Sequence, residues 1–291
     1  MSGIFCWKKV RYNKMKRIAI QGIKGSFHDI AAHLYFENEE LDMVYCDTFD
    51  DLFQTMREES NTLGMMAIEN TIAGSLLSNY ELLRASGTEI VGEHKLHIQH
   101  SIMCLPDDDW DTLTEANSHP VALMQCRIFL SHHPHLKMVE TFDTAGSARD
   151  IKAKNLKGHA AICHPMAAEI YGMKVLEDHI EDNKHNFTRF LVLSNPLFAD
   201  DLRERNRANK SSLVFTLPHT EGSLSSVLSI FTFYKINLTK IQSLPIVGSE
   251  WNYLFYVDVT YQDPIRFHQS IEAVRPLTRE MKVLGEYTAA K

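Results

Sequence analysis

The chain has 291 residues, more than one domain usually contains, so we expect two domains. An apolar content of 44% with 23% charged residues is ordinary for a globular protein. The formal net charge of −7 argues against nucleic acid or an anionic membrane as the partner, because such partners require clusters of basic residues.

The five cysteines are scattered along the chain and include no C-x-x-C pair. This pattern predicts neither a disulfide framework nor a zinc site, and it fits reduced thiols in a cytoplasmic protein. Residues 1–15 contain too few consecutive apolar residues for a signal peptide, and no run in the chain approaches the length of a membrane span. We therefore expect an N-terminal extension over residues 1–15 and a cytoplasmic location.

From residue 16 to residue 196, apolar runs typical of strands alternate with segments of helical periodicity. The expected strands are 17–21, 43–47, 64–70, 136–142 and 159–163. The expected helices are 27–38, 49–59, 121–133 and 144–155. Strands separated by helices of this length pair in parallel, so the region predicts an α/β fold.

A polar and charged segment, 197–210, follows this region and predicts a linker. Beyond it, residues 211–291 have the order strand, helix, strand, strand, helix, strand. This βαββαβ order predicts a ferredoxin-like domain.

A turn with two glycines, GIKGSF (22–27), connects the first strand to the first helix. It lacks the third glycine of a dinucleotide-binding motif and so does not predict a nucleotide cofactor. Its glycines permit close approach of the backbone to a ligand, and the start of the next helix offers unpaired N–H groups. The turn is either a plain connection or an anion site.

The spacing of His94, His97 and His100 resembles that of metal ligands. However, Leu96 and Ile98 alternate with polar residues, as they do in a strand. Residues three apart on a strand point to opposite faces, so these histidines do not share one ion and we expect no metal.

Three polar residues, Asn186, Thr188 and Arg189, precede the apolar run of residues 190–193. The residues alone leave two interpretations open. They form the ordinary polar start of a core strand, or they carry a hydroxyl and a guanidinium to the edge of a ligand cleft.

Several segments resemble, in chain order, motifs of the prephenate dehydratase family. They are GIKGSF (22–27), IENTIAGS (68–75), HPVALMQC (119–126), DTAGSA (143–148) and IEDNKHNFTRF (180–190). The resemblance runs from Arg17 to the end of the chain. It implies a monofunctional enzyme, because no chorismate mutase region precedes Arg17.

The resemblance implies a catalytic domain over residues 16–196, with two subdomains arranged as in periplasmic binding proteins. These subdomains are residues 16–96 with 188–196, and residues 97–187. The C-terminal unit is similar to an ACT domain, which implies a homodimer or homotetramer assembled through this unit.

The family converts prephenate to phenylpyruvate, CO₂ and water in phenylalanine biosynthesis, without a cofactor or a metal. By resemblance, Thr188 assists the leaving hydroxyl, Arg189 holds a substrate carboxylate or supports the site electrostatically, and Phe190 completes the catalytic triplet. The residues implied to bind substrate are Gly25, Ser26, Phe27, His28, Asn70, Thr71, Ser75, Thr144, Ala145, Gly146 and Asn186. Helix starts at Ser26, Ser75 and Thr144 are expected to direct N–H groups at the anion.

Two of these residues depart from the family pattern. Thr71 replaces the usual Ser but keeps its hydroxyl. His28 stands where the family has Ser or Thr. It either forms a hydrogen bond as a cation or faces solvent.

The resemblance to ACT domains also implies phenylalanine as an effector. The residues implied to bind it are Gly222, Ser223, Leu224, Gln242, Ser243, Leu244 and Pro245. Gln242 and Leu244 replace the Glu and Arg of the family motif, so we expect weaker binding than that motif allows.

Two other functions stay open on the sequence. The first is arogenate dehydratase, which performs the same chemistry on the aminated substrate. The second is a non-catalytic amino-acid-binding regulator, against which the intact Asn186, Thr188, Arg189 and Phe190 argue.

Overall fold

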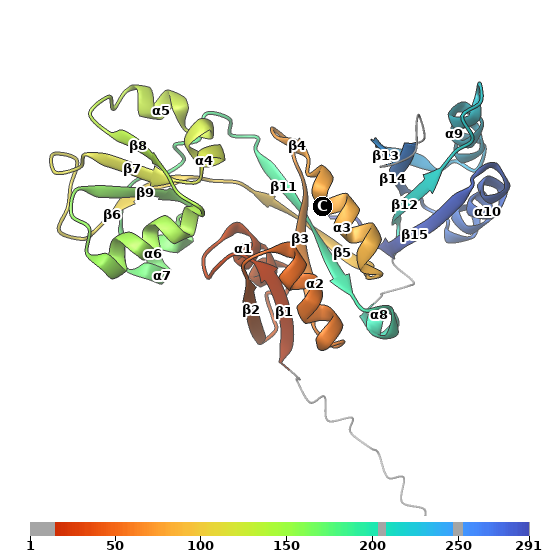
Figure 1. Ribbon diagram of the computed structural model, residues 1–291, viewed down its shortest axis with the longest axis horizontal. Helices are drawn as coiled ribbons and strands as arrows, with labels where there is room; N and C mark the ends of the chain where they lie inside the picture. Colours follow the sequence, from red (N-terminus) through yellow and green to blue (C-terminus); the bar gives the residue numbers. More distant parts are fainter. Residues whose placement is uncertain (1–14, 203–207, 247–252, 291) are drawn as a thin grey trace, which may run out of the picture.

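The computed structural model describes residues 15–202, 208–246 and 253–290. Three β-sheets follow one another along the molecule (Figure 1). We call the central sheet with its helices the first lobe, the sheet of β6 to β10 with its helices the second lobe, and the sheet of β12 to β15 with its helices the C-terminal module. The expected N-terminal extension lies outside the described residues except for Met15.

The first lobe has a mixed sheet of order β2-β1-β3-β11-β5, with β4 paired to the end of β3. Its strands are β1 (Lys16–Gln21), β2 (Leu41–Cys46), β3 (Leu63–Asn70), β4 (Gly74–Ser75), β5 (Glu89–His97) and β11 (Phe187–Ser194). Its helices are α1 (Phe27–Tyr35), α2 (Phe49–Glu58), α3 (Leu77–Ser86) and α8 (Pro196–Leu202). β1 is parallel to β2 and β3, as expected for strands that helices separate. β11 is antiparallel to both neighbours because it returns from the second lobe.

Alternate residues of β11 pack in two different cores. Phe190 and Val192 join the core that contains α1, whereas Leu191 and Leu193 join the core that contains α2 and α3. Side chains alternate between the two faces of a sheet. Phe190 and Val192 therefore pack on one side of the sheet of the first lobe, and Leu191 and Leu193 pack on the other.

The second lobe has the strand order β10-β6-β9-β7-β8. Its strands are β6 (Ser101–Cys104), β7 (Glu115–Ser118), β8 (Lys137–Glu140), β9 (His159–Cys163) and β10 (Lys174–Glu177). Its helices are α4 (Pro120–Gln125), α5 (Arg127–Ser131), α6 (Thr144–Lys154) and α7 (Met166–Tyr171). β7 is parallel to β8 and β9, and β6 is antiparallel to β9 and β10.

The single helix expected over 121–133 is divided into α4 and α5. Asp182 supplies the reason, because its backbone N–H donates to the carbonyl of Gln125 at 2.7 Å. Its carboxylate then accepts from the backbone N–H of Ile128 at 3.0 Å. These bonds replace helical bonds at the break, and they hold the chain that leads to β11.

The chain passes between the two lobes twice, after β5 and before β11 (Figure 1). The two crossing segments are paired, because the backbone N–H of Ile98 donates to the carbonyl of Asn186 at 2.8 Å. The side chain of His97 also bonds the carbonyl of Lys184 at 2.7 Å. The lobes are therefore joined by a hydrogen-bonded double connection.

The C-terminal module has the βαββαβ order that the sequence predicts. It contains β12 (Lys210–Thr216), α9 (Ser223–Phe233), β13 (Asn237–Pro245), β14 (Tyr253–Thr260), α10 (Pro264–Val274), the 3₁₀-helix η2 (Arg275–Leu277) and β15 (Glu280–Tyr287). Its antiparallel sheet has the order β13-β14-β12-β15, which is the ferredoxin-like arrangement.

The segment expected as a linker begins with a helix. Residues 196–202 form α8, and the side chain of Asn195 accepts from the backbone N–H of Leu197 at its start. An asparagine ahead of Pro196 is a helix-start signal that the polar composition of the segment conceals.

The C-terminal module shares a core with the first lobe. Leu244 and Tyr256 of the module lie in the same buried cluster as Leu83 and Leu191. At Gly285 a Cβ atom would lie 2.1 Å from the carbonyl oxygen of Ile90, so only glycine lets β15 approach β5 this closely. The module is packed on the face of the sheet that carries α2 and α3.

Candidate active site

A cavity of about 280 Å³ lies between the two lobes. It is lined by Ser26, Phe27, His28, Ala67, Asn70, Ala73, Leu76, Ile98, His100, His119, Val121, Ala122, Gln125, Asp143, Thr144, Thr188 and Phe190. The starts of α1, α4 and α6, the end of β3 and the start of β11 thus converge on one space. A concave site of this kind, mostly apolar with a few polar groups, is typical of small-molecule binding.

Thr188 presents its hydroxyl at this cavity. The side-chain amide of Asn70 donates to Thr188 Oγ1 at 3.0 Å. Because the amide occupies an acceptor position of the oxygen, the hydroxyl hydrogen of Thr188 is available to an acceptor in the cavity. Phe190 follows two residues later on the same face of β11 and forms part of the apolar wall.

The orientation of the Asn70 amide is fixed by its surroundings. Its Oδ1 accepts from the backbone N–H groups of Ile72 at 2.9 Å and Ala73 at 2.8 Å. Its Nδ2 therefore faces β11, where it also donates to Asn186 Oδ1 at 2.7 Å. Asn186 is fully buried and does not line the cavity, so it holds Asn70 rather than a ligand.

His28 is neutral and takes part in the wall of the cavity. Its Nε2 accepts from the backbone N–H of Ala67 at 3.2 Å, and its ring meets the edges of Phe49 and Phe190. Burial lowers the pKa of His28 to about 4. Both expectations for this residue were wrong, because the imidazole is neither a cation nor turned to solvent. With Nε2 as the acceptor, Nδ1 carries the proton.

Phe27 connects the lobes across the cavity. Its ring lies edge-on to His100 and His164 of the second lobe, with centroids 5.6 and 5.9 Å away. Burial is the main cause that lowers the pKa of His100, and it lowers the pKa of His164 to about 4. Nε2 of His100 bonds Oε1 of Gln125 at 3.0 Å. This wall is therefore polar but uncharged.

Asp143 supplies a carboxylate to the cavity at the start of α6. Its Oδ1 accepts from the backbone N–H of Gly146 at 2.6 Å, and burial raises the pKa of its carboxyl group. Thr144 lines the cavity, whereas Ala145 is fully buried behind it. The expectation that this helix start receives an anion is wrong for Gly146, because Asp143 already occupies its N–H.

The turn before α1 is capped in a similar way. Gly25 has φ +82°, and its N–H donates to the carboxylate of Asp29 at 2.8 Å. A Cβ at Gly25 would lie 3.2 Å from Ile170 of the second lobe, and the hydroxyl of Tyr171 bonds the carbonyl of Lys24. Gly25 thus serves the contact between lobes, while Ser26 lines the cavity.

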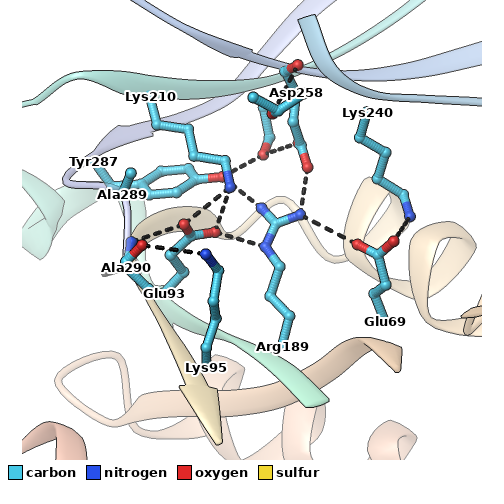
Figure 2. Close-up of polar contacts among 12 residues, drawn as sticks. Glu69, Glu93, Lys95, Arg189, Lys210, Lys240, Asp258, Tyr287, Ala289 and Ala290 are labelled. Carbon is cyan, nitrogen blue, oxygen red and sulfur yellow. Dashed lines mark hydrogen bonds and ion pairs between the residues drawn. The ribbon is translucent and has the colours of Figure 1, made fainter. Parts of the chain in front are cut away.

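Arg189 points away from the cavity. Its guanidinium lies within a buried network with Glu93 of β5 and with Asp258 and Tyr287 of the C-terminal module (Figure 2). The expectation that Arg189 holds a substrate carboxylate is therefore wrong. Adjacent residues of a strand face opposite sides, so Thr188 and Arg189 do not serve the same site.

Thr71 and Ser75 also lie outside the cavity lining. The hydroxyl of Thr71 bonds the carbonyl of His185 and the N–H of Phe187, which secures the crossing segment. Ser75 belongs to β4 rather than to a helix start, because α3 begins at Leu77.

A model of the prephenate dehydratase family matches residues 18–197 of the chain. The chain belongs to the prephenate dehydratase family. The matched region covers both lobes and ends within α8.

Named relatives cover nearly all of the chain. Arogenate dehydratase 5 of Arabidopsis thaliana is 35% identical in an alignment 290 residues long, which covers 93% of this chain and 67% of the plant protein. The bifunctional chorismate mutase/prephenate dehydratase of Enterobacter agglomerans is 31% identical, over 93% of this chain and 70% of that protein. The chain thus spans about two thirds of the length of these relatives.

A solved structure supports the same family. Prephenate dehydratase from Arthrobacter aurescens in complex with L-Phe matches with a TM-score of 0.83 at 25% identity. The match covers 94% of this chain and 90% of that chain, so it includes the C-terminal module.

Among the polar cavity residues, four were not singled out as binding residues from the sequence: His100, His119, Gln125 and Asp143. His119 and Gln125 belong to the segment HPVALMQC and Asp143 to DTAGSA, both of which resemble family motifs. The resemblance of these segments to family motifs was the sequence signal for His119, Gln125 and Asp143. His100 was considered only as a metal ligand, and its place here depends on the double connection between lobes.

The residues expected to bind an effector lie on α9 and β13. Gly222 precedes α9 with φ +75°, where a side chain would be strained. Gln242 is half-buried, and Ser243 and Pro245 are exposed. Leu244 is buried in the core shared with the first lobe, so its side chain is not part of an exposed effector surface.

Within the described ranges, no three His, Cys, Asp or Glu side chains are grouped so that they could hold a metal ion. Among the helices of the described residues, none has the length and apolarity needed to cross a membrane.

Proposed function

We propose that the protein converts prephenate to phenylpyruvate, CO₂ and water, as a step of phenylalanine biosynthesis. The observation that carries this proposal is the Thr188 hydroxyl, which faces the cavity with Asn70 donating to its oxygen at 3.0 Å. The family match and the prephenate dehydratases among the relatives support the substrate class.

For this reaction the enzyme has to position the substrate and to supply polar groups at the reacting atoms. The C–C bond to the ring carboxylate breaks and releases CO₂, its electron pair enters the ring, and the ring hydroxyl leaves with one proton as water. Formation of the aromatic ring drives these steps. The catalyst must therefore stabilise the oxygen that departs.

Thr188 is suited to that task through a hydrogen bond rather than full proton transfer, because an alcohol is a weak acid. A preorganised donor in a closed site contributes about 10²–10³ in rate. Asn70 orients the donor, and the rings of Phe27, His28 and Phe190 form an uncharged wall beside it. Desolvation of the site strengthens each polar contact.

The activity is tested by incubating the purified protein with prephenate and measuring phenylpyruvate. Formation at a rate that depends on enzyme concentration supports the proposal. Binding of prephenate without turnover would favour the amino-acid-binding regulator instead.

Arogenate is a second candidate substrate, and one feature of the cavity favours it. Asp143 is the one carboxylate among the described lining residues, and these include neither lysine nor arginine. Arogenate carries an ammonium group where prephenate has a keto group, so its cation is able to pair with Asp143. The plant arogenate dehydratases among the relatives point the same way. Turnover of both substrates by one preparation separates the candidates.

We further propose that residues 16–196 form the catalytic domain and that residues 211–291 form an ACT domain that binds phenylalanine and assembles the protein as a homodimer or homotetramer. The ferredoxin-like order and the L-Phe complex of the Arthrobacter enzyme support this assignment. Gly222, Ser223 and Leu224 with Gln242, Ser243 and Pro245 are the residues we assign to the effector.

A further inference from the structure

Two cross-strand pairs lie back to back at the end of the central sheet. Thr188 of β11 is in register with Asn70 of β3, and Arg189 is in register with Glu69. The first pair faces the cavity between the lobes, and its amide donates to its hydroxyl. The second pair faces the C-terminal module (Figure 2). One short stretch of two strands thus serves two sides of the molecule.

Arg189 is held by both sides of that interface. Its Nε bonds Glu93 of the first lobe at 2.6 Å. Its other nitrogens bond Asp258 and the hydroxyl of Tyr287 of the module, the latter at 2.9 Å. Lys210 of the module completes the network by bonding Glu93 at 2.8 Å.

Glu69 is held by the module in the same way. Lys240 of β13 bonds its carboxylate at 2.6 Å, and also bonds the hydroxyl of Ser75 at 2.8 Å. Ser75 is in register with Glu69 across the β3–β4 hairpin. One lysine of the module therefore fixes both strands of the hairpin that carries Asn70.

The charges in this network depend on one another. Arg189 is 8% exposed, Glu93 4% and Asp258 5%. Buried charges are costly unless they are fully paired, and loss of the partners in the module would leave the guanidinium of Arg189 with only Glu93 and the more distant Glu69, so its position would shift. Such a shift moves β11 at the residue next to Thr188.

We propose that Glu69 and Arg189 are positioning residues that make the Asn70–Thr188 hydrogen bond depend on docking of the C-terminal module. Neither residue lines the cavity; each acts through its neighbour on the strand. The inference rests on the proposed dehydratase function for its kinetic readout, and on hydrogen exchange for a readout that needs no activity.

The test uses two substitutions in the module, Asp258→Asn and Lys240→Met, in the full chain. Each is expected to lower kcat about tenfold while KM changes less than about twofold, because small misplacements of catalytic groups impair turnover. Amide exchange at residues 69–70 and 187–190 is expected to accelerate. Exposed charges of the same module provide matched controls, Glu272→Gln and Lys282→Met, which are expected to leave both readouts unchanged.

A double variant, Lys240→Met with Glu69→Gln, checks the route. If Lys240 acts through Glu69, the double variant loses no more activity than Glu69→Gln alone, whereas independent effects multiply. Thermal unfolding identifies any variant that is merely unfolded. If Asp258→Asn does not fold, Lys240→Met still tests the positioning role, since the Lys240 side chain lies at the margin of the network.

The proposed function and the positioning role of Glu69 and Arg189 fail on different results. A wild-type protein without activity on prephenate or arogenate overturns the proposed function, and the exchange data still test the coupling. An active wild type with folded Lys240→Met and Asp258→Asn variants of unchanged kcat and unchanged exchange overturns the positioning role.

Discussion

Thr188 and Arg189 are consecutive residues, yet their side chains serve opposite faces of one sheet. The hydroxyl of Thr188 accepts from Asn70 at the cavity between the lobes. The guanidinium of Arg189 bonds Glu93 on the other face, together with groups of the C-terminal module. The alternation of a strand thus separates the chemistry from the interface between domains.

Arg189 is expected to stabilise the folded protein through its buried network of ion pairs and hydrogen bonds. Arg189→Met is expected to lower the free energy of unfolding by roughly 3–5 kcal/mol, because Asp258 loses the arginine it bonds and Glu93 keeps only Lys210 as its cation. Urea denaturation measures the change. Arg275→Met removes an exposed arginine that pairs with Glu272, and it is expected to cost less than about 1 kcal/mol. Equal costs for the two variants would remove the special role of Arg189.

His28 makes stability depend on pH. Its pKa in the folded state is about 4, below the ordinary value of 6.5. Between these values the unfolded chain binds a proton that the folded protein excludes. The stabilisation is complete above pH 6.5 and is lost as the pH falls towards 4, by about 1.4 kcal/mol per pH unit.

His28→Gln keeps an acceptor for the N–H of Ala67 but does not titrate. Its free energy of unfolding is therefore expected to fall less steeply between pH 6.5 and 4 than that of the wild type. His164 retains its own lowered pKa, so part of the slope remains in the variant. Identical slopes would mean that His28 is protonated in the folded protein.

Asp143 is expected to influence the choice of substrate. Asp143→Asn removes the carboxylate from the cavity but keeps an oxygen that accepts from the N–H of Gly146. The ratio of kcat/KM for arogenate to that for prephenate is expected to fall about tenfold, an order of magnitude typical of a lost charge-assisted hydrogen bond. An unchanged ratio, measured with both substrates on one preparation, would show that Asp143 does not contact the amino group.

Phenylalanine is expected to bind the C-terminal module, but weakly. Gln242 and Leu244 remove the Glu and Arg of the family motif together, so no charge is left unpaired and the module still folds. Titration of phenylalanine against activity, and by calorimetry, is expected to give a dissociation constant well above the micromolar range. Micromolar inhibition would show that the replaced residues are dispensable.

The architecture was largely predictable from local pattern. The elements from β1 to β3 and the βαββαβ order follow from apolar periodicity, which local residues determine. Helix α3 was missed because no side chain caps its start, α7 because six residues are too few to show a helical period, and α8 because its start signal lies in a polar segment. The antiparallel entry of β11 depends on the long return from the second lobe, which no local pattern records.

The site was predictable in part. The motifs identified Thr188, Phe190 and Asn70, which meet in the cavity, and placed Arg189 beside them without regard to the alternation of strands. That alternation was readable in the sequence and would have separated Thr188 from Arg189. The burial that keeps His28 neutral was not readable, because it arises from Phe49 and Phe190, which are distant in the chain.

If the Thr188 hydroxyl assists the departing oxygen, its removal in Thr188→Ala must slow turnover. The kcat of this variant is expected to fall by about two to three orders of magnitude, while binding of a product-like inhibitor changes little. Thr188→Ser, measured beside it, is expected to retain much of the rate because the hydroxyl remains. Near wild-type turnover by a folded Thr188→Ala variant would show that Thr188 is not the donor to the departing oxygen.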